Sequence, residues 1–195
     1  LKRLAIGWEQ ALAEPAAKVL GRKAPPPTIT NFAKFSLEKL LERRQLPDRS
    51  APNGSSIAVL AEFDGRSVLL TGDAHADVLV SSIKRLLTER GGKDKKLKLD
   101  AIKLSHHGSA NATTTALLDV IDCRRYLVSS NGNIYYHPDR EAIARVILHG
   151  GRNPALLFNY RSTYNGLWEQ PILKKRYEYR TVYPPAGTEG LRVSL

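Results

Sequence analysis

The chain has 195 residues and a formal net charge of +11, and 42% of its residues are hydrophobic. This length and apolar content suffice for one globular core, and a single cysteine excludes a disulfide-stabilised scaffold and favours a reducing compartment. No run is apolar enough to span a bilayer and no signal peptide is recognised, so a cytoplasmic location is expected. The positive charge favours a polyanionic partner, most simply nucleic acid, although basic residues can also merely solvate a surface.

The amino-terminal region, residues 1–47, is predicted to be a helical segment with a linker. Apolar residues recur at helical spacing over 1–20, interrupted by Pro15, and the proline run at 25–27 forms a stiff linker. A second helix is predicted at 31–45, with its basic residues on a solvated face. The stretch 47–54 has the turn composition of a loop.

The central region, residues 48–150, alternates between strand and helix patterns. Strands at 56–63 and 67–70 flank Asp64-Gly65, a hairpin turn signal. The pattern continues through a helix at 74–90, an exposed charged run at 93–98, a strand at 99–104, a helix at 111–122, a strand at 126–129 and a helix at 140–149. This order predicts an α/β layered fold.

The carboxy-terminal region, residues 151–195, is predicted to be a β-rich tail that packs on the same domain. Its β segments are expected at 155–160, 174–183 and 191–195. Tyrosines alternate with charged residues from 176 to 183, which is typical of a half-buried edge strand. The same pattern could also form a stacking platform for single-stranded nucleic acid.

Potential metal ligands follow two of the predicted strands. The run Ser67-Val-Leu-Leu-Thr-Gly ends at Asp73, and the run from Asp100 ends at His106-His107-Gly-Ser109. Ligands collect at the carboxyl ends of strands in α/β sheets, so these side chains are expected at one edge. Carboxylate together with imidazole suits zinc or manganese.

Each candidate also has a simpler interpretation. Asp73 could be an ordinary turn residue after glycine, and the two adjacent histidines could be packed with satisfied nitrogens. Ordinary roles are favoured for three other residues: surface exposure at a helix start for His75, a helix carboxyl end for His149, and core packing for Cys123.

Four motifs in this order carry a resemblance to a known family. They are Asn53-Gly-Ser55-Ser, Leu69-Leu-Thr-Gly-Asp73-Ala, Lys103-Leu-Ser-His106-His107-Gly-Ser109 and Tyr136-His137-Pro138. Together they resemble the second half of a metallo-β-lactamase-fold hydrolase, in the branch that includes the hydrolase domain of the ComEC competence proteins. The match covers roughly residues 48–147 and, more loosely, the tail.

The resemblance implies half of an αββα sandwich with two divalent metal ions, zinc or manganese, at one sheet edge. Asp73 takes the place of the bridging carboxylate. One of His106 and His107 takes the place of a histidine ligand, with His107 favoured, and the other would hold the site or meet the substrate. His137 matches a position near the metals that ligates or donates a proton.

The resemblance also implies contacts to substrate. Asn53 and Ser55 match a polar turn close to the metals, and Ser109 lies in the same motif as the histidine pair. The catalytic set expected from the resemblance is therefore Asp73, His106, His107 and His137, with Asn53, Ser55 and Ser109 touching substrate.

The best-known motif of that family, His-x-His-x-Asp-His, is absent from this chain. The sequence therefore carries about half of a metal site, and it also lacks methionine and begins at Leu1. The amino-terminal half is expected as a separate chain or upstream segment, produced by cleavage, a split gene or a cut sequence. A degenerate homologue without metal is the alternative. A half-sandwich exposes an apolar sheet face, so the chain is not expected to fold alone.

Resemblance and charge together predict a metal-dependent hydrolase, most simply a phosphodiesterase or nuclease acting on nucleic acid. A partner-activated effector in a bacterial antiviral defence complex is one setting that suits a half site. Two alternatives stay open: a catalytically inactive binding or scaffold module, and a hydrolase of small esters, lactams or phosphorylcholine-like groups. Metal content and salt-sensitive nucleic-acid binding separate them.

Overall fold

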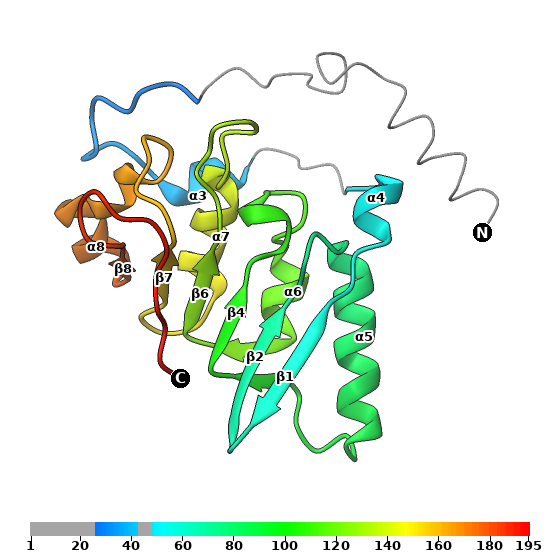
Figure 1. Ribbon diagram of the computed structural model, residues 1–195. Helices are drawn as coiled ribbons and strands as arrows, with labels where there is room; N and C mark the ends of the chain where they lie inside the picture. The colour runs from blue at the N-terminus through cyan, green and yellow to red at the C-terminus, as the bar shows by residue number, and fades with distance from the viewer. Residues whose placement is uncertain (1–25, 43–47) are drawn as a thin grey trace.

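A six-stranded, mostly parallel sheet organises the chain (Figure 1). The computed structural model describes residues 26–42 and 48–195. The strand order is β1-β2-β4-β6-β7-β8, and only β1 is antiparallel to its neighbour. The strands are β1 Val59–Phe63, β2 Arg66–Leu70, β4 Ala101–Lys103, β6 Arg125–Val128, β7 Ala155–Phe158 and β8 Arg180–Val182. The predicted α/β class is confirmed.

A second, two-stranded parallel sheet pairs β3 (Leu97–Leu99) with β5 (Ile121–Cys123). Three helices, α5, α6 and α7, lie behind the main sheet in the view of Figure 1. The helices are α3 Leu37–Leu41, α4 Ala51–Gly54, α5 Ala76–Glu89, α6 Thr115–Asp119, α7 Arg140–His149 and α8 Pro171–Tyr177, with 3₁₀ turns η1 Ser105–Gly108 and η2 Gly166–Glu169. No helix within the described residues is long and apolar enough to cross a membrane.

The core lies between the main sheet and these helices. Alternate strand residues point to opposite faces, and cross-strand partners share a face. Leu69, Ile102, Tyr126 and Leu156 lie on one face and are at most 5% exposed. Helix residues complete this core, among them Leu79, Ile83, Leu117, Ile143 and Val146. The sheet is therefore well covered on one side.

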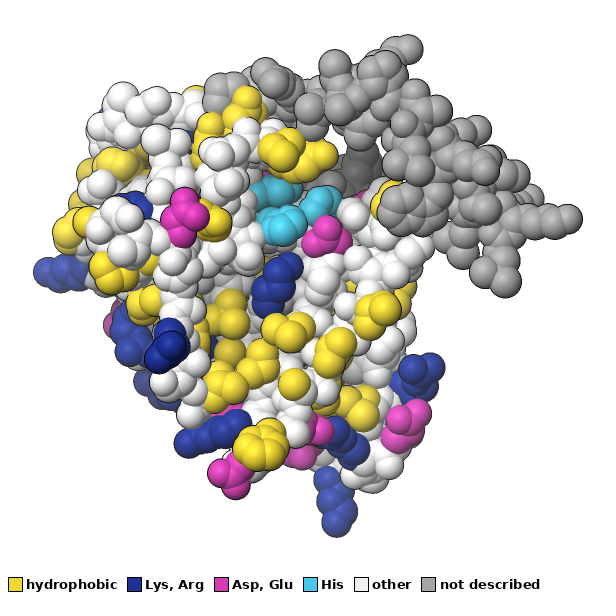
Figure 2. Space-filling view, in the orientation of Figure 1, with side chains coloured by type: hydrophobic (Ala, Val, Ile, Leu, Met, Phe, Trp, Pro, Cys, Tyr) yellow, Lys and Arg dark blue, Asp and Glu magenta, His cyan; other side chains and the backbone are white. Residues whose placement is uncertain are grey.

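The opposite face of the sheet is apolar and open over its first strands. Cross-strand partners on this face include Val59 with Leu70 and Ala61 with Val68. Val59 and Leu70 are 47% and 44% exposed. Figure 2 shows hydrophobic side chains spread over this face. The carboxy-terminal segment crosses the same side of the sheet over its later strands (Figure 1), where the Ser194 carbonyl accepts a hydrogen bond from Arg125 of β6. We refer to the uncovered surface of β1, β2 and β4 as the open face.

Several predicted boundaries held because their signals are local. The hairpin turn at Asp64 and Gly65 has positive φ at both residues, as the Asp-Gly signal requires. The helix at 140–149 has the predicted bounds. The strand at 155–160 is β7, and β8 joins it in the same sheet, so the tail extends the sheet of the central region.

The amino-terminal predictions are only partly tested. The helix at 1–20 and most of the proline linker lie outside the described residues. The helix predicted at 31–45 contains only α3 within the described part of the chain, because Ser36 caps it and accepts a hydrogen bond from Lys39 N. The loop predicted at 47–54 contains α4, which begins at Ala51 with proline in its first turn.

Two central elements were predicted too long. The strand at 99–104 is two strands in different sheets, because the chain turns at Asp100, whose carboxylate accepts from Ser67 N and Arg66. The charged run at 93–98 accordingly ends in β3. The helix at 111–122 is only α6, since Thr114 caps its start and β-branched residues lead into β5.

The predicted strand at 174–183 is wrong. Proline at the first position of α8 starts a helix here, and Glu178 ends it in the left-handed conformation before the short β8. The tyrosines form no stacking platform: Tyr177 bonds Glu38, Tyr179 is buried, and the Tyr183 ring stacks on Phe158. Residues 191–195 form no strand either.

Candidate functional site

The carboxyl ends of β2, β4 and β6 converge on one cleft of about 470 Å³. Hydrogen bonds join the loops that follow these strands. The Thr71 hydroxyl donates to the Lys103 carbonyl, the Ser105 hydroxyl donates to the Ala74 carbonyl, and His106 N donates to the Gly72 carbonyl. These bonds bring the loop containing Asp73 against the loop containing the histidine pair.

Five of the predicted residues line this cleft. Figure 2 shows histidine side chains gathered beside an acidic side chain at the end of the open face. The lining includes all four predicted catalytic residues and one of the three predicted substrate contacts: Asn53, Asp73, His106, His107 and His137. The structure therefore brings together side chains that are up to 84 positions apart in the sequence.

The most informative pair is His107 with Asp73. His107 Nδ1 lies 2.5 Å from the Ser129 carbonyl oxygen, which can only accept, so Nδ1 carries the proton. The Nε2 lone pair is then free, and Nε2 lies 3.8 Å from Asp73 Oδ1. Zinc binds nitrogen and oxygen at about 2.0–2.2 Å, so one ion between the two atoms could touch both. A carbonyl that fixes the tautomer is the usual support of a metal-binding histidine.

Two ligands do not complete a metal site. Within residues 26–42 and 48–195, no group of three or more His, Cys, Asp or Glu side chains could hold a metal ion. The donor set fits one edge of a zinc or manganese centre. The remaining ligands would have to come from elsewhere.

The histidine pair occupies a strained turn. His106 and His107 have φ of 48° and 57°, and Gly108 has φ of 82°. The left-handed region is unfavourable for residues with a Cβ, by roughly 1–2 kcal/mol each. At Gly108 an added Cβ would lie 2.9 Å from Pro138 Cβ. The turn aims both imidazoles into the cleft, and strain of this kind clusters at functional sites.

This strain predicts an order of stability at position 107. His107→Gly should unfold with a free energy about 1 kcal/mol higher than His107→Ala, because both lose the Ser129 hydrogen bond and only glycine relieves the strain. Denaturant unfolding of the native protein measures the difference. The control is Lys84 in the middle of α5. There the alanine variant should have a free energy of unfolding about 1 kcal/mol higher than the glycine variant. Equal stabilities at position 107 would contradict the strained turn.

His106 belongs to a hydrogen-bonded triangle with Asp48 and Asn53. Asn53 Nδ2 donates to Asp48 Oδ2 at 2.5 Å, and His106 Nδ1 lies 3.3 Å from the same carboxylate oxygen. Burial, together with the nearby His137, lowers the pKa of His106, although Asp73 and Asp48 oppose this shift. Although burial opposes ionisation of Asp48, the hydrogen bonds from Asn53 and Ser50 lower its pKa to about 2.

The triangle predicts an acid-labile contribution to stability. The pKa of Asp48 falls from 3.8 to about 2 on folding, which corresponds to at most about 2 kcal/mol. This stabilisation is complete above about pH 4 and is lost as the pH falls towards 2. Asp48→Asn should therefore lower the unfolding free energy at pH 7 and flatten its decline between pH 4 and 2, measured with chelator present. The exposed Asp119→Asn should do neither. An unchanged acid profile in Asp48→Asn would contradict the assignment.

His137 is 5% exposed and lies beside His106, with ring centroids 5.4 Å apart. Within the described part of the chain its Nδ1 has no hydrogen-bond partner, and it sits 3.4 Å from Asp139 Oδ1, which is long for a hydrogen bond. Burial with an unsatisfied nitrogen suits a group that takes up a further partner in the cleft.

Two predicted substrate contacts lie outside the cleft. The exposed Ser55 turns its hydroxyl back onto the Ala51 carbonyl in α4. Ser109 is 4% exposed and sits behind the histidine turn, where its backbone N donates to the His106 carbonyl. Both residues are close to the motifs in sequence and lie near the site, but their side chains do not point into the cleft.

The remaining candidates have structural roles, one of them not as predicted. His75 is not a surface residue: its side chain is 16% exposed and its Nε2 is 3.1 Å from the Ser50 carbonyl, so it ties α4 to the loop after β2. His149 is exposed at the end of α7, and Cys123 is 3% exposed, as expected.

Sequence reasoning missed several groups that contact or support the residues of the cleft. Asp48 contacts His106 from a stretch that shows only loop composition. Lys103 lies beside Asp73 and donates to the Gly72 carbonyl at 3.1 Å, and burial lowers its pKa. The Ser129 carbonyl is a backbone group, for which no side-chain pattern exists. Only Lys103, a lone cation at the end of a strand, left a signal in the sequence.

The fold and cleft define an α/β protein whose polar site lies at the carboxyl ends of parallel strands, where open α/β sheets bind ligands. Among curated proteins, the chain is similar to ComE operon protein 3 of Bacillus subtilis (strain 168), with 25% identity over 152 residues. The match covers 75% of this chain and 17% of that protein, so the chain spans a small part of its relative. No family model matches the chain, and no solved structure matches it. The similarity supports the ComEC-like resemblance, while the metallo-β-lactamase fold stays a prediction.

Proposed function

We propose that this chain carries the carboxy-terminal half of the active site of a metal-dependent phosphodiesterase that acts on DNA. The observation that carries the proposal is the His107–Asp73 pair, in which the Ser129 carbonyl fixes the imidazole and leaves Nε2 facing the carboxylate at 3.8 Å. The His107 side chain is 45% exposed, so Nε2 is open to a ligand that enters the cleft.

The residues in and around the cleft would have different roles in catalysis. Asp73 and His107 would hold zinc or manganese, which when bound lowers the pKa of water and stabilises charge on a phosphoryl oxygen. Asp48 and Asn53 hold the His106 imidazole in the cleft, where burial and the nearby His137 lower its pKa. The ammonium of Lys103 lies at the same strand end and can attract a phosphate oxygen.

The open face supports an amino-terminal half as the partner, one that would bring the remaining ligands. Val59, Leu70 and Phe63 are 47%, 44% and 86% exposed. Single exposed apolar residues are common on protein surfaces, whereas a contiguous exposed apolar patch marks an interaction site. A second sheet packed on this face would cover it and would end beside the cleft. This half could be a separate chain or an upstream segment.

Nucleic acid is the substrate that charge and similarity favour. The net charge of +11 favours a polyanion, and the similarity to ComE operon protein 3 favours a role related to DNA uptake. The native protein is therefore expected to contain about two zinc or manganese ions and to cleave DNA.

Metal analysis and intact mass of the natively purified protein test this function, followed by a cleavage assay with DNA, with RNA and with a small chromogenic phosphodiester. Bound metal with cleavage of DNA would support the proposal. A folded native protein without metal or cleavage would refute it and leave a binding or scaffold module. Cleavage of the small ester alone would leave a small-molecule hydrolase.

A further inference from the structure

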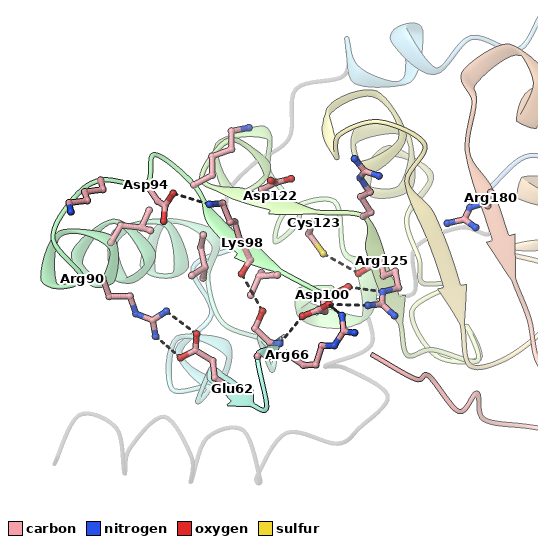
Figure 3. A pocket seen from close by; sticks show the side chains of 18 residues that line it. Glu62, Arg66, Arg90, Asp94, Lys98, Asp100, Asp122, Cys123, Arg125 and Arg180 are labelled. Carbon is pink, nitrogen blue, oxygen red and sulfur yellow. Dashed lines mark hydrogen bonds and ion pairs between the residues drawn. The ribbon is translucent and has the colours of Figure 1, made fainter.

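A basic basin lies at the end of the sheet opposite the cleft. It is an open hollow of about 970 Å³ where the parallel strands begin, bordered by the end of α5, the following loop and the junction of β5 with β6. Figure 3 shows the ion pairs that surround it: Glu62 with Arg90, Asp94 with Lys98, and Asp100 between Arg66 and Arg125. None of these residues takes part in the candidate site.

The basin carries an excess of positive charge. Eight basic and four acidic residues line it, so it holds a net +4 of the chain's net +11. Three of the four carboxylates are paired with basic residues of the basin itself. The uncompensated charge comes from side chains that have no hydrogen bond or ion pair within the described residues: Lys93, Lys96, Arg124 and Arg180.

These four unpaired basic side chains are spread along the basin and are not clustered at one position. Lys93 and Lys96 lie in the loop after α5, Arg124 precedes β6, and Arg180 begins β8. Arg124 and Arg180 stand at the starts of β6 and β8, which are two steps apart in the sheet, or about 10 Å at the usual strand spacing. A single phosphate could not engage charges so far apart, whereas a duplex presents a charge about every 1.7 Å of its axis.

The lining also selects between forms of nucleic acid. No aromatic side chain is among the residues that line the basin, so it offers no surface on which unpaired bases could stack. Lysine and arginine without such a platform contact the phosphate backbone irrespective of sequence.

We infer that the basin is a binding site for the phosphate backbone of double-stranded nucleic acid, with Lys93, Lys96, Arg124 and Arg180 as its contacts. This goes beyond the proposed catalysis, because binding here requires neither the metal nor the cleft. The basin would hold a duplex while the opposite end of the sheet carries the chemistry.

The test compares two fourfold alanine variants of the native protein that lose equal charge. One replaces Lys93, Lys96, Arg124 and Arg180. The control replaces four exposed lysines that lie away from the basin and whose side chains make no hydrogen bond or ion pair within the described residues: Lys34, Lys39, Lys84 and Lys175. The affinity for a duplex of random sequence is measured between 50 and 200 mM salt, concentrations on the order of those that resolve phosphate contacts, with chelator present to prevent cleavage.

The basin variant should lose on the order of 100- to 1,000-fold in duplex affinity, and the slope of log affinity against log salt should fall by about 3 to 4 units. The control should change the slope by less than about 1 unit. Equal slopes in the two variants would overturn the inference. Loss of binding to polyglutamate with duplex binding intact would overturn it in favour of an acidic protein segment.

Turnover of the small chromogenic phosphodiester separates this inference from the proposed function. The basin variant should keep that turnover, which also reports that it is folded, so a failure of catalysis and a failure of duplex binding are observed independently. If the fourfold variant does not fold, the loop variant Lys93→Ala/Lys96→Ala should still lower the slope by about 2 units, and an unchanged slope would overturn the inference.

Discussion

Asp73→Ala should lower the phosphodiesterase activity of the native protein on the order of a thousandfold, because the loss of a metal ligand removes several kcal/mol of stabilisation from the transition state. The side chain of Asp73 accepts no hydrogen bond within the described residues and is 35% exposed. Its removal should therefore leave the fold largely intact, and metal content should fall together with activity.

The matched control is Asp119→Ala, which removes an exposed carboxylate that has no bonding partner within the described residues. It should keep full activity and metal content. Thermal unfolding of both variants shows whether either is damaged globally. An Asp73→Ala protein with normal activity would exclude this residue as a ligand.

The double variant Val59→Lys/Leu70→Lys should abolish association between this chain and its amino-terminal half. The two residues are cross-strand partners on the open face, so one interface buries both. Each loses about 1.5–3 kcal/mol of apolar burial, and two lysines facing an apolar sheet add a desolvation penalty. Affinity should fall by a factor on the order of 1,000 or more.

Co-expression of the two halves as separate chains, followed by co-purification and titration, measures this effect. The control is Val78→Lys/Ile172→Lys on α5 and α8, which changes two residues of similar exposure, 51% and 43%, outside the sheet. Equal association of both variants would show that the open face is not the interface.

The candidate site was predictable to the extent that it follows strand ends. Asp73 and the histidine pair follow β2 and β4, which are parallel neighbours in the sheet, and parallel strands bring their carboxyl ends to one edge. Asp48 could not be predicted, because its contact with His106 spans 58 positions and leaves no periodic pattern. Ser129 contributes a carbonyl, whose direction depends on the backbone alone.

The predictability of the fold also depends on whether an element is determined by local sequence signals or by tertiary contacts. The helix at 140–149 and the hairpin depend on caps and turns that lie within a few residues. The prediction for the tail was wrong because its alternating tyrosines suggest a strand, whereas Tyr179 is buried against Trp168 and the half-buried Tyr183 stacks on Phe158. Those contacts are tertiary, and they override the local β preference of the segment.

The left-handed turn at His106 and His107 determines which substitutions at these two positions would stabilise the chain. Replacement of either residue by glycine, or by asparagine, would relieve backbone strain. In a lineage under selection for stability alone, such replacements would accumulate here. Two consecutive imidazoles in this conformation therefore lower the stability of the chain relative to glycine at the same positions. Related chains that have lost the chemistry of the cleft should be recognisable by small residues at these two positions.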